Sequence, residues 1–126
     1  MNEVVLILVA IGFIPPFLMG LFAPGKVLAQ FGVNDLPIDA RNEARAVYGG
    51  MHLFFILAIC ASLVLPQLRA GVTLTIGCCM AGLVFGRVFS ILIDRKLGKL
   101  PAMWLVLELI ASGLLFASLL LDHSSI

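Results

Sequence analysis

Charged side chains are scarce in this sequence, where they make up 12% of 126 residues, against about a quarter in ordinary globular domains. Hydrophobic residues account for 62%. A soluble domain of this length cannot bury so much apolar surface, which makes lipid the expected solvent of the protein. The net charge is +1, and no basic run with interleaved aromatic residues occurs, so the sequence gives no indication of nucleic-acid binding.

Short motifs that carry enzyme chemistry are also missing. The sequence has no His-Glu-x-x-His, no Gly-x-Ser-x-Gly and no glycine-rich phosphate loop. Cys60, Cys78 and Cys79 lie inside apolar runs without a Cys-x-x-Cys spacing, so we interpret them as small packing residues and not as a disulfide framework. Because histidine, cysteine and carboxylate residues do not gather at one place, no metal and no cofactor is predicted.

Four apolar stretches are long enough to cross a bilayer as helices, which takes about 20 residues each. The first lacks the basic start and the short apolar core of a cleaved signal peptide, so it is interpreted as a retained helix. Tight connections after the second and third stretches indicate antiparallel neighbours. The sequence therefore predicts one all-α domain, an integral membrane four-helix up-down-up-down bundle. Its helices are expected over residues 3–23, 44–65, 71–93 and 102–121, with a long cytoplasmic loop at 24–43.

Lysine and arginine are distributed unequally between the two sides of this bundle. The side of the first and third connections holds six of them, whereas the other side holds only Arg69. Because basic residues concentrate on the cytoplasmic side of membrane proteins, both termini are expected on the non-cytoplasmic side. The six basic residues are Lys26, Arg41, Arg45, Arg95, Lys96 and Lys99.

Three ionisable side chains fall at nearly one level inside the predicted spans. At 1.5 Å per residue, Arg87, Glu108 and His52 lie about 7, 5 and 4 Å to the cytoplasmic side of the midpoints of their helices. A lone charge at such depth costs about 2.5–3.5 kcal/mol. We therefore predict that Arg87 and Glu108 pair inside the bundle. His52 is expected nearby, as a group that can change its charge near neutral pH.

Other polar and small residues share helix faces with these three. Spacings of three and four residues join Ser90 and Asp94 to Arg87, and Arg45, Tyr48 and Gly49 to His52. Gly82 and Gly86 continue a stripe of small residues, which favours close helix packing. Two interpretations stay open for the polar faces. Either they line a ligand pocket, or the Arg87–Glu108 pair fixes helix register while Arg45 and Tyr48 lie at the membrane interface and Asp94 at a solvated helix end.

Two stretches resemble a known group of proteins. NEARAVYGG gives Asn42, Arg45, Gly49 and Gly50, and GRVFSILIDRKLGKLP gives Gly86, Arg87, Ser90, Asp94 and Pro101. Together they resemble small bacterial four-helix membrane proteins, DoxX-like in style, whose domain has no assigned function. The resemblance covers the second helix through the start of the fourth and implies a bacterial inner membrane. It adds Asn42 to the candidate ligand-binding residues and Gly50 to the packing glycines.

Three functions are compatible with these features. Polar groups at one depth favour a protein that binds or transports a small ligand, a lipid head group or an ion inside the membrane. Four helices leave little room for a full transport pathway, so a homodimer in membrane lipid is expected for a transporter. Small size, short loops and the missing catalytic motifs favour an accessory or assembly subunit of a larger membrane complex. A membrane enzyme that acts on a lipophilic substrate through His52, Glu108 and Tyr48 is the third and least favoured hypothesis.

Overall fold

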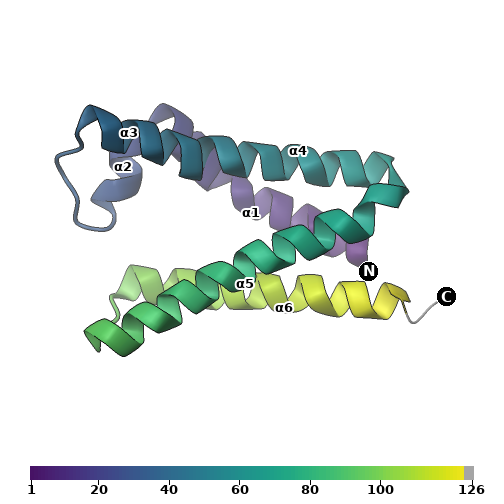
Figure 1. Ribbon diagram of the computed structural model, residues 1–126. Coiled ribbons are helices and arrows are strands. Elements are labelled where there is room, and N and C mark those ends of the chain that lie inside the picture. The colour runs from purple at the N-terminus through teal and green to yellow at the C-terminus, as the bar shows by residue number, and fades with distance from the viewer. Residues whose placement is uncertain (124–126) are drawn as a thin grey trace. The chain divides into compact units, whose positions relative to one another are not determined.

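Every regular element in residues 1–123, the part of the chain that the computed structural model describes, is a helix (Figure 1). The predicted all-α class is therefore confirmed. Four helical stretches are long and apolar enough to cross a membrane, as the sequence predicts, and the protein is a multi-pass membrane protein. These stretches are Asn2–Phe22, Ile38–Val64, Pro66–Asp94 and Lys99–Asp122.

The second span is longer than the sequence suggests. It joins α3 (Ile38–Ala44), the π-helical segment η1 (Arg45–Gly50) and α4 (Met51–Val64), and so begins at Ile38 and not near residue 44. Pro37 is extended, with φ −56° and ψ 159°, and its carbonyl oxygen accepts the Arg41 N–H at 3.0 Å. The residues of α3 are mostly polar, so they do not belong to an apolar stretch of the sequence. As a result, His52 lies next to the midpoint of this span.

The connection between the first two spans contains a short helix, α2 (Pro24–Ala29). Proline suits the first turn of a helix because the N–H that it lacks has no partner there. The segment ends in a Schellman motif. The Val33 N–H donates to the Leu28 carbonyl at 3.1 Å, and the Gly32 N–H donates to the Ala29 carbonyl at 3.0 Å. Gly32 has φ 84°, a backbone conformation that glycine adopts without a steric penalty.

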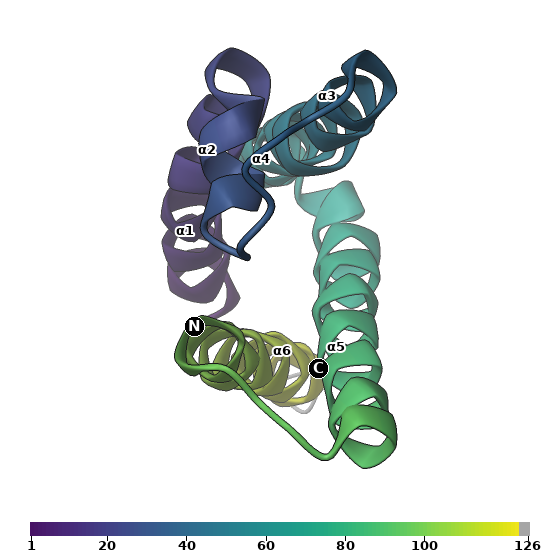
Figure 2. The ribbon, with the colours of Figure 1, turned by 90° about the vertical axis from the view of Figure 1, so that its left-hand side faces the viewer.

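The chain divides into two units, and one of them is a helical hairpin joined by the first turn of the chain. It contains residues 1–6 and the elements η2 (Pro66–Leu68), α5 (Arg69–Asp94) and α6 (Lys99–His123). Arg95 ends α5 with φ 49° and donates its N–H to the Ile91 carbonyl at 2.9 Å. The chain then reverses, so that α5 and α6 run antiparallel (Figure 1; Figure 2).

The hairpin is held by one face of each helix. A methyl group added at Gly77 of α5 would lie 3.3 Å from the Phe116 ring of α6, so a residue without a side chain allows the helices to approach closely here. The residues that the unit buries recur at intervals of three and four, as expected of two helices that pack along one seam. On α5 they are Thr73, Ile76, Gly77 and Met80, and on α6 they are Glu108, Ser112, Leu115 and Ser118.

The other unit, residues 7–64, pairs the rest of α1 (Asn2–Phe22) with the second span. The two helices meet at glycines: a methyl group built on Gly20 would collide with the backbone of Tyr48 and Gly49. Further along, the Phe13 ring lies 5.3 Å from the His52 ring and 5.5 Å from the Phe55 ring, measured between centroids. Gly20 of α1 contacts Gly49, whereas the earlier residue Phe13 contacts the later residues His52 and Phe55. The two helices therefore also run antiparallel.

Candidate intramembrane polar site

Arg87 of α5 and Glu108 of α6 form a two-point ion pair. Arg87 Nε donates to Glu108 Oε2 at 2.6 Å, and Arg87 Nη2 donates to Glu108 Oε1 at 2.7 Å. The carboxylate side chain is 9% exposed and the guanidinium side chain 24% exposed. The parallel arrangement of two N–H groups and two oxygens is the strongest geometry for this pair of groups. The predicted pairing of Arg87 with Glu108 is confirmed.

Buried hydroxyl groups on the same face of α6 have local partners. Ser112 donates to the Leu109 carbonyl at 3.1 Å, and Ser118 donates to the Leu115 carbonyl at 2.8 Å. A serine that bonds to its own helix is satisfied without a neighbour, which makes it easy to accommodate in an apolar seam. Each of these two serines thus uses its O–H within α6.

A polar stripe runs from Arg87 toward the end of α5. Ser90 donates to Asp94 Oδ2 at 3.1 Å, one turn further along the helix, and both side chains are exposed. The next residues form the exposed basic turn that joins α5 to α6, which contains Arg95, Lys96 and Lys99. At 1.5 Å per residue, about 10 Å of helix separates Arg87 from Asp94. The pair thus lies at the inner end of a polar path along one helix.

The remaining candidate ligand-binding residues belong to the other unit. Arg45 Nε donates to the Leu21 carbonyl at 3.3 Å, and His52 Nδ1 lies 3.0 Å from the Val47 carbonyl oxygen. Tyr48 is half-buried, and Asn42 is exposed on α3. Their convergence with Arg87, Glu108, Ser90 and Asp94 on a single polar site stays a prediction.

The four glycines singled out for packing occupy different surroundings. Gly49 is buried, and a methyl group there would lie 2.7 Å from Leu21 Cδ2, whereas at Gly50 the nearest atom would be 3.7 Å away. Gly82 and Gly86 are exposed, and apart from the adjacent backbone of α5 no described atom of their own unit lies within 4 Å of an added methyl group. Helix α5 turns a different glycine, Gly77, toward α6.

In the described part of the chain, no three His, Cys, Asp or Glu side chains lie close enough together to hold a metal ion. Cys60, Cys78 and Cys79 are free and exposed on their helices.

A family model described as a domain of unknown function, DUF4345, matches residues 1–119. The chain belongs to this family. The match includes both partners of the ion pair and all four spans up to the last turns of α6. No curated protein and no solved structure matches the chain. Membership of DUF4345 agrees with the expectation of a family without an assigned activity, and the family description assigns no reaction to the pair.

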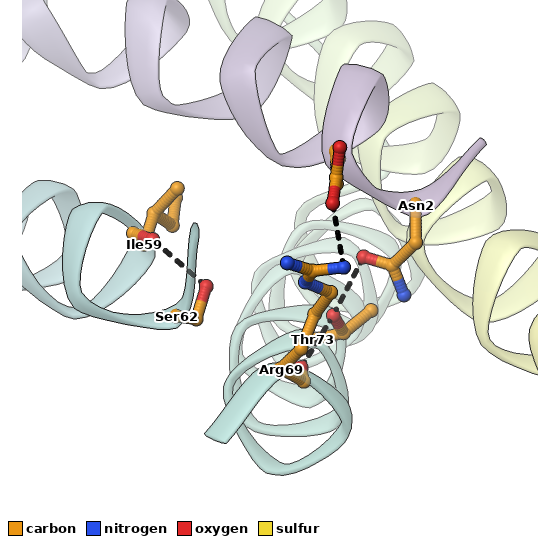
Figure 3. Close-up of polar contacts among 6 residues, drawn as sticks. Asn2, Ile59, Ser62, Arg69 and Thr73 are labelled. Carbon is orange, nitrogen blue, oxygen red and sulfur yellow. Dashed lines mark hydrogen bonds and ion pairs between the residues drawn. The ribbon is translucent and has the colours of Figure 1, made fainter. Parts of the chain in front are cut away.

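This DUF4345 protein has a second polar cluster that sequence reasoning missed, at the start of α5 (Figure 3). Thr73 Oγ1 lies 2.8 Å from the Arg69 carbonyl oxygen and 3.1 Å from Asn2 Oδ1, so both oxygens are within reach of its single O–H. Arg69 Nη1 lies 2.7 Å from Glu3 Oε1. Thr73 and Asn2 are buried, whereas the Glu3 side chain is 58% exposed. The sequence did contain a signal for the Glu3–Arg69 pair. The two residues have opposite charges and lie at helix ends that are both expected on the non-cytoplasmic side of the membrane.

Proposed function

We propose that this protein binds or transports a small ligand, a lipid head group or an ion at the Arg87–Glu108 pair. The observation that carries the proposal is a two-point ion pair, buried between two apolar helices that are long enough to span a membrane. A ligand that carries a phosphate or carboxylate group matches the planar donor fork of a guanidinium.

Energetic reasoning supports a functional role for the pair. Removing two charges from water costs more than their attraction returns in many proteins, so apolar side chains of similar volume hold helices together at least as well. Ionisable side chains inside membrane spans accordingly mark ligand or ion pathways as a rule. In this pair the guanidinium is the more exposed partner, at 24% against 9%. An incoming ligand would therefore meet Arg87 before Glu108.

The proposed route to the site follows the polar stripe on α5. Arg95, Lys96 and Lys99 are exposed and would raise the local concentration of an anion at the end of the helix. Ser90 and Asp94 lie between this turn and Arg87 on the same stripe. A small anionic group that enters from the basic turn would thus travel about two helical turns to reach the pair.

In the proposed setting, a bacterial inner membrane, the basic turn faces the cytoplasm and both termini face away from it. The unequal distribution of lysine and arginine supports this orientation. We expect alkaline phosphatase fused after residue 126 to be active in cells and green fluorescent protein fused there to remain dark. Fluorescence from the second fusion without phosphatase activity in the first would place the carboxyl terminus in the cytoplasm and reverse the proposed orientation.

Native mass spectrometry of protein purified in mild detergent tests the site. The wild-type protein is expected to retain a bound lipid or anion. The double variant Arg87→Leu/Glu108→Leu should bind it at least tenfold more weakly, because it removes the charges while leaving an apolar seam. The matched control, Glu3→Gln/Arg69→Gln, removes the Glu3–Arg69 ion pair and should retain the ligand.

Equal retention by both double variants would overturn the assignment of the site to Arg87 and Glu108. Recovery of a protein partner in place of a small ligand would favour the accessory-subunit hypothesis instead. The exposed glycines Gly82 and Gly86 are where a partner helix would approach the α5 backbone most closely.

A further inference from the structure

The His52 ring is oriented by the backbone of its own helix. Its Nδ1 lies 3.0 Å from the Val47 carbonyl oxygen. A carbonyl oxygen only accepts hydrogen bonds, so Nδ1 carries the proton of this contact. In the uncharged form of the ring, Nε2 then holds a lone pair and no proton. The fold thus fixes which nitrogen of His52 is the hydrogen-bond acceptor.

Within residues 7–64, the unit that contains His52, this acceptor receives no hydrogen bond. His52 is half-buried and lies next to the midpoint of the span Ile38–Val64. Water is absent from the hydrocarbon core, where an unsatisfied polar group costs free energy. A molecule that brings a hydrogen-bond donor to Nε2 removes this cost. Such a molecule has to be lipophilic, because it reaches the ring from within an apolar region.

Aromatic rings surround the imidazole. Phe13 contacts it edge-on, at 5.3 Å between centroids with an interplanar angle of 85°. Phe55 lies at 6.2 Å, and Tyr48 lies nearly parallel to the imidazole at 6.5 Å with an angle of 8°. Rings gain from edge-to-face and offset contacts beyond the burial of their area. The immediate neighbours of the acceptor therefore favour a ligand that is itself aromatic.

The backbone beside the ring is also irregular. The π-helical segment η1, Arg45–Gly50, ends two residues before His52, and it contains the carbonyl that holds the imidazole. Single π-helical turns inside α-helices occur often at functional sites. Here the wider turn coincides with the close approach of Gly20 to Gly49, so the segment that orients the imidazole is held against α1.

We propose that His52 is the recognition residue of a second binding site, one for a lipophilic phenol. The phenolic O–H donates to His52 Nε2, and the ring of the ligand packs with Phe13, Tyr48 and Phe55. The site belongs wholly to the unit formed by residues 7–64. Arg87 and Glu108 belong to the other unit, so different variants test the two proposals.

The test compares two probes that differ in one hydrogen-bond donor. 4-Hexylphenol carries the O–H. 4-Hexylanisole has the same ring and hexyl tail, but a methoxy group replaces the O–H. Binding to the full chain is measured by equilibrium dialysis in phosphatidylcholine nanodiscs, after subtraction of the uptake by empty nanodiscs. The phenol is expected to bind about tenfold more tightly than the ether, which corresponds to one hydrogen bond in an apolar site.

Substitution then assigns the preference to the imidazole. His52→Phe keeps an aromatic ring and removes the acceptor, so the two probes should bind equally. His123→Gln changes the other histidine of the chain, and the preference for the phenol should persist. Equal binding of both probes to the wild-type protein, or a preference that survives in His52→Phe, would overturn the proposal.

A measurement on the protein with an intact site guards against misfolding of the variant. The chain has two histidines, so His123→Gln labelled with ¹⁵N-histidine reports on His52 alone. Addition of 4-hexylphenol is expected to shift the Nε2 resonance to lower frequency, as acceptance of a hydrogen bond does, while 4-hexylanisole leaves it in place. A shift with both probes, or with neither, contradicts recognition of the phenolic O–H by Nε2.

Discussion

Replacing Glu108 with leucine is expected to lower the free energy of unfolding by about 3–5 kcal/mol, because it leaves the guanidinium of Arg87 without its carboxylate inside the hairpin. The double variant Arg87→Leu/Glu108→Leu should regain most of this loss, since no charge then remains in the seam. The measurement is denaturant unfolding in detergent micelles, followed by far-ultraviolet circular dichroism. A complete double-mutant cycle, with Arg87→Leu as the other single variant, separates the pair from its parts.

The Glu3–Arg69 pair provides the matched control for this cycle. It has the same chemistry and a comparable distance of 2.7 Å, but the Glu3 side chain is 58% exposed. Water solvates such a partner, and exposed pairs are worth about 0–1 kcal/mol. Glu3→Leu should therefore change the stability much less than Glu108→Leu. If the double variant at positions 87 and 108 were as unstable as the single variants, the pair would be a net source of stability, and the energetic case for its functional role would fail.

Sequence reasoning located this pair for two physical reasons. Charges are rare inside apolar spans, so Arg87 and Glu108 stand out, and the tight turn between their helices limits the choice of partner. The four spans could also be predicted from the sequence, because the thickness of a bilayer fixes the length of an apolar helix. The start of the second span could not be predicted in this way. Ile38–Ala44 is a short polar helix, and residue type alone does not distinguish it from a loop.

Contacts between distant parts of the chain were beyond the same reasoning. Thr73 and Asn2 are separated by 71 positions, and neither residue is unusual in its own segment. The spacing of small residues is equally ambiguous. Gly82 and Gly86 follow a regular stripe but are exposed, whereas Gly77 packs against the Phe116 ring. Periodicity shows which residues share a face of a helix, but which face meets a neighbour depends on the fit of all side chains along the seam.

The close approach of Gly20 and Gly49 is the packing feature on which substitution should act most strongly. A Cβ atom at position 20 would lie 2.5 Å from the carbonyl carbon of Tyr48 and 2.8 Å from Gly49 Cα. Backbone atoms do not move aside as a flexible side chain does. We therefore expect Gly20→Ala to lower the free energy of unfolding by about 3 kcal/mol, at the upper end of the usual cost of overpacking.

Gly12→Ala is the control within the same helix, because apart from the adjacent backbone of α1 no described atom of its own unit lies within 4 Å of the added methyl group. Alanine favours the helical backbone over glycine by about 1 kcal/mol, so Gly12→Ala should be neutral or slightly stabilising. The two variants are compared by thermal and denaturant unfolding in the same detergent. Gly20→Ala should also weaken the binding of 4-hexylphenol, since separation of the two helices moves Phe13 away from His52. Equal stability of Gly12→Ala and Gly20→Ala would show that α1 and η1 do not meet at these glycines in the membrane, and the aromatic site that depends on their contact would lose its support.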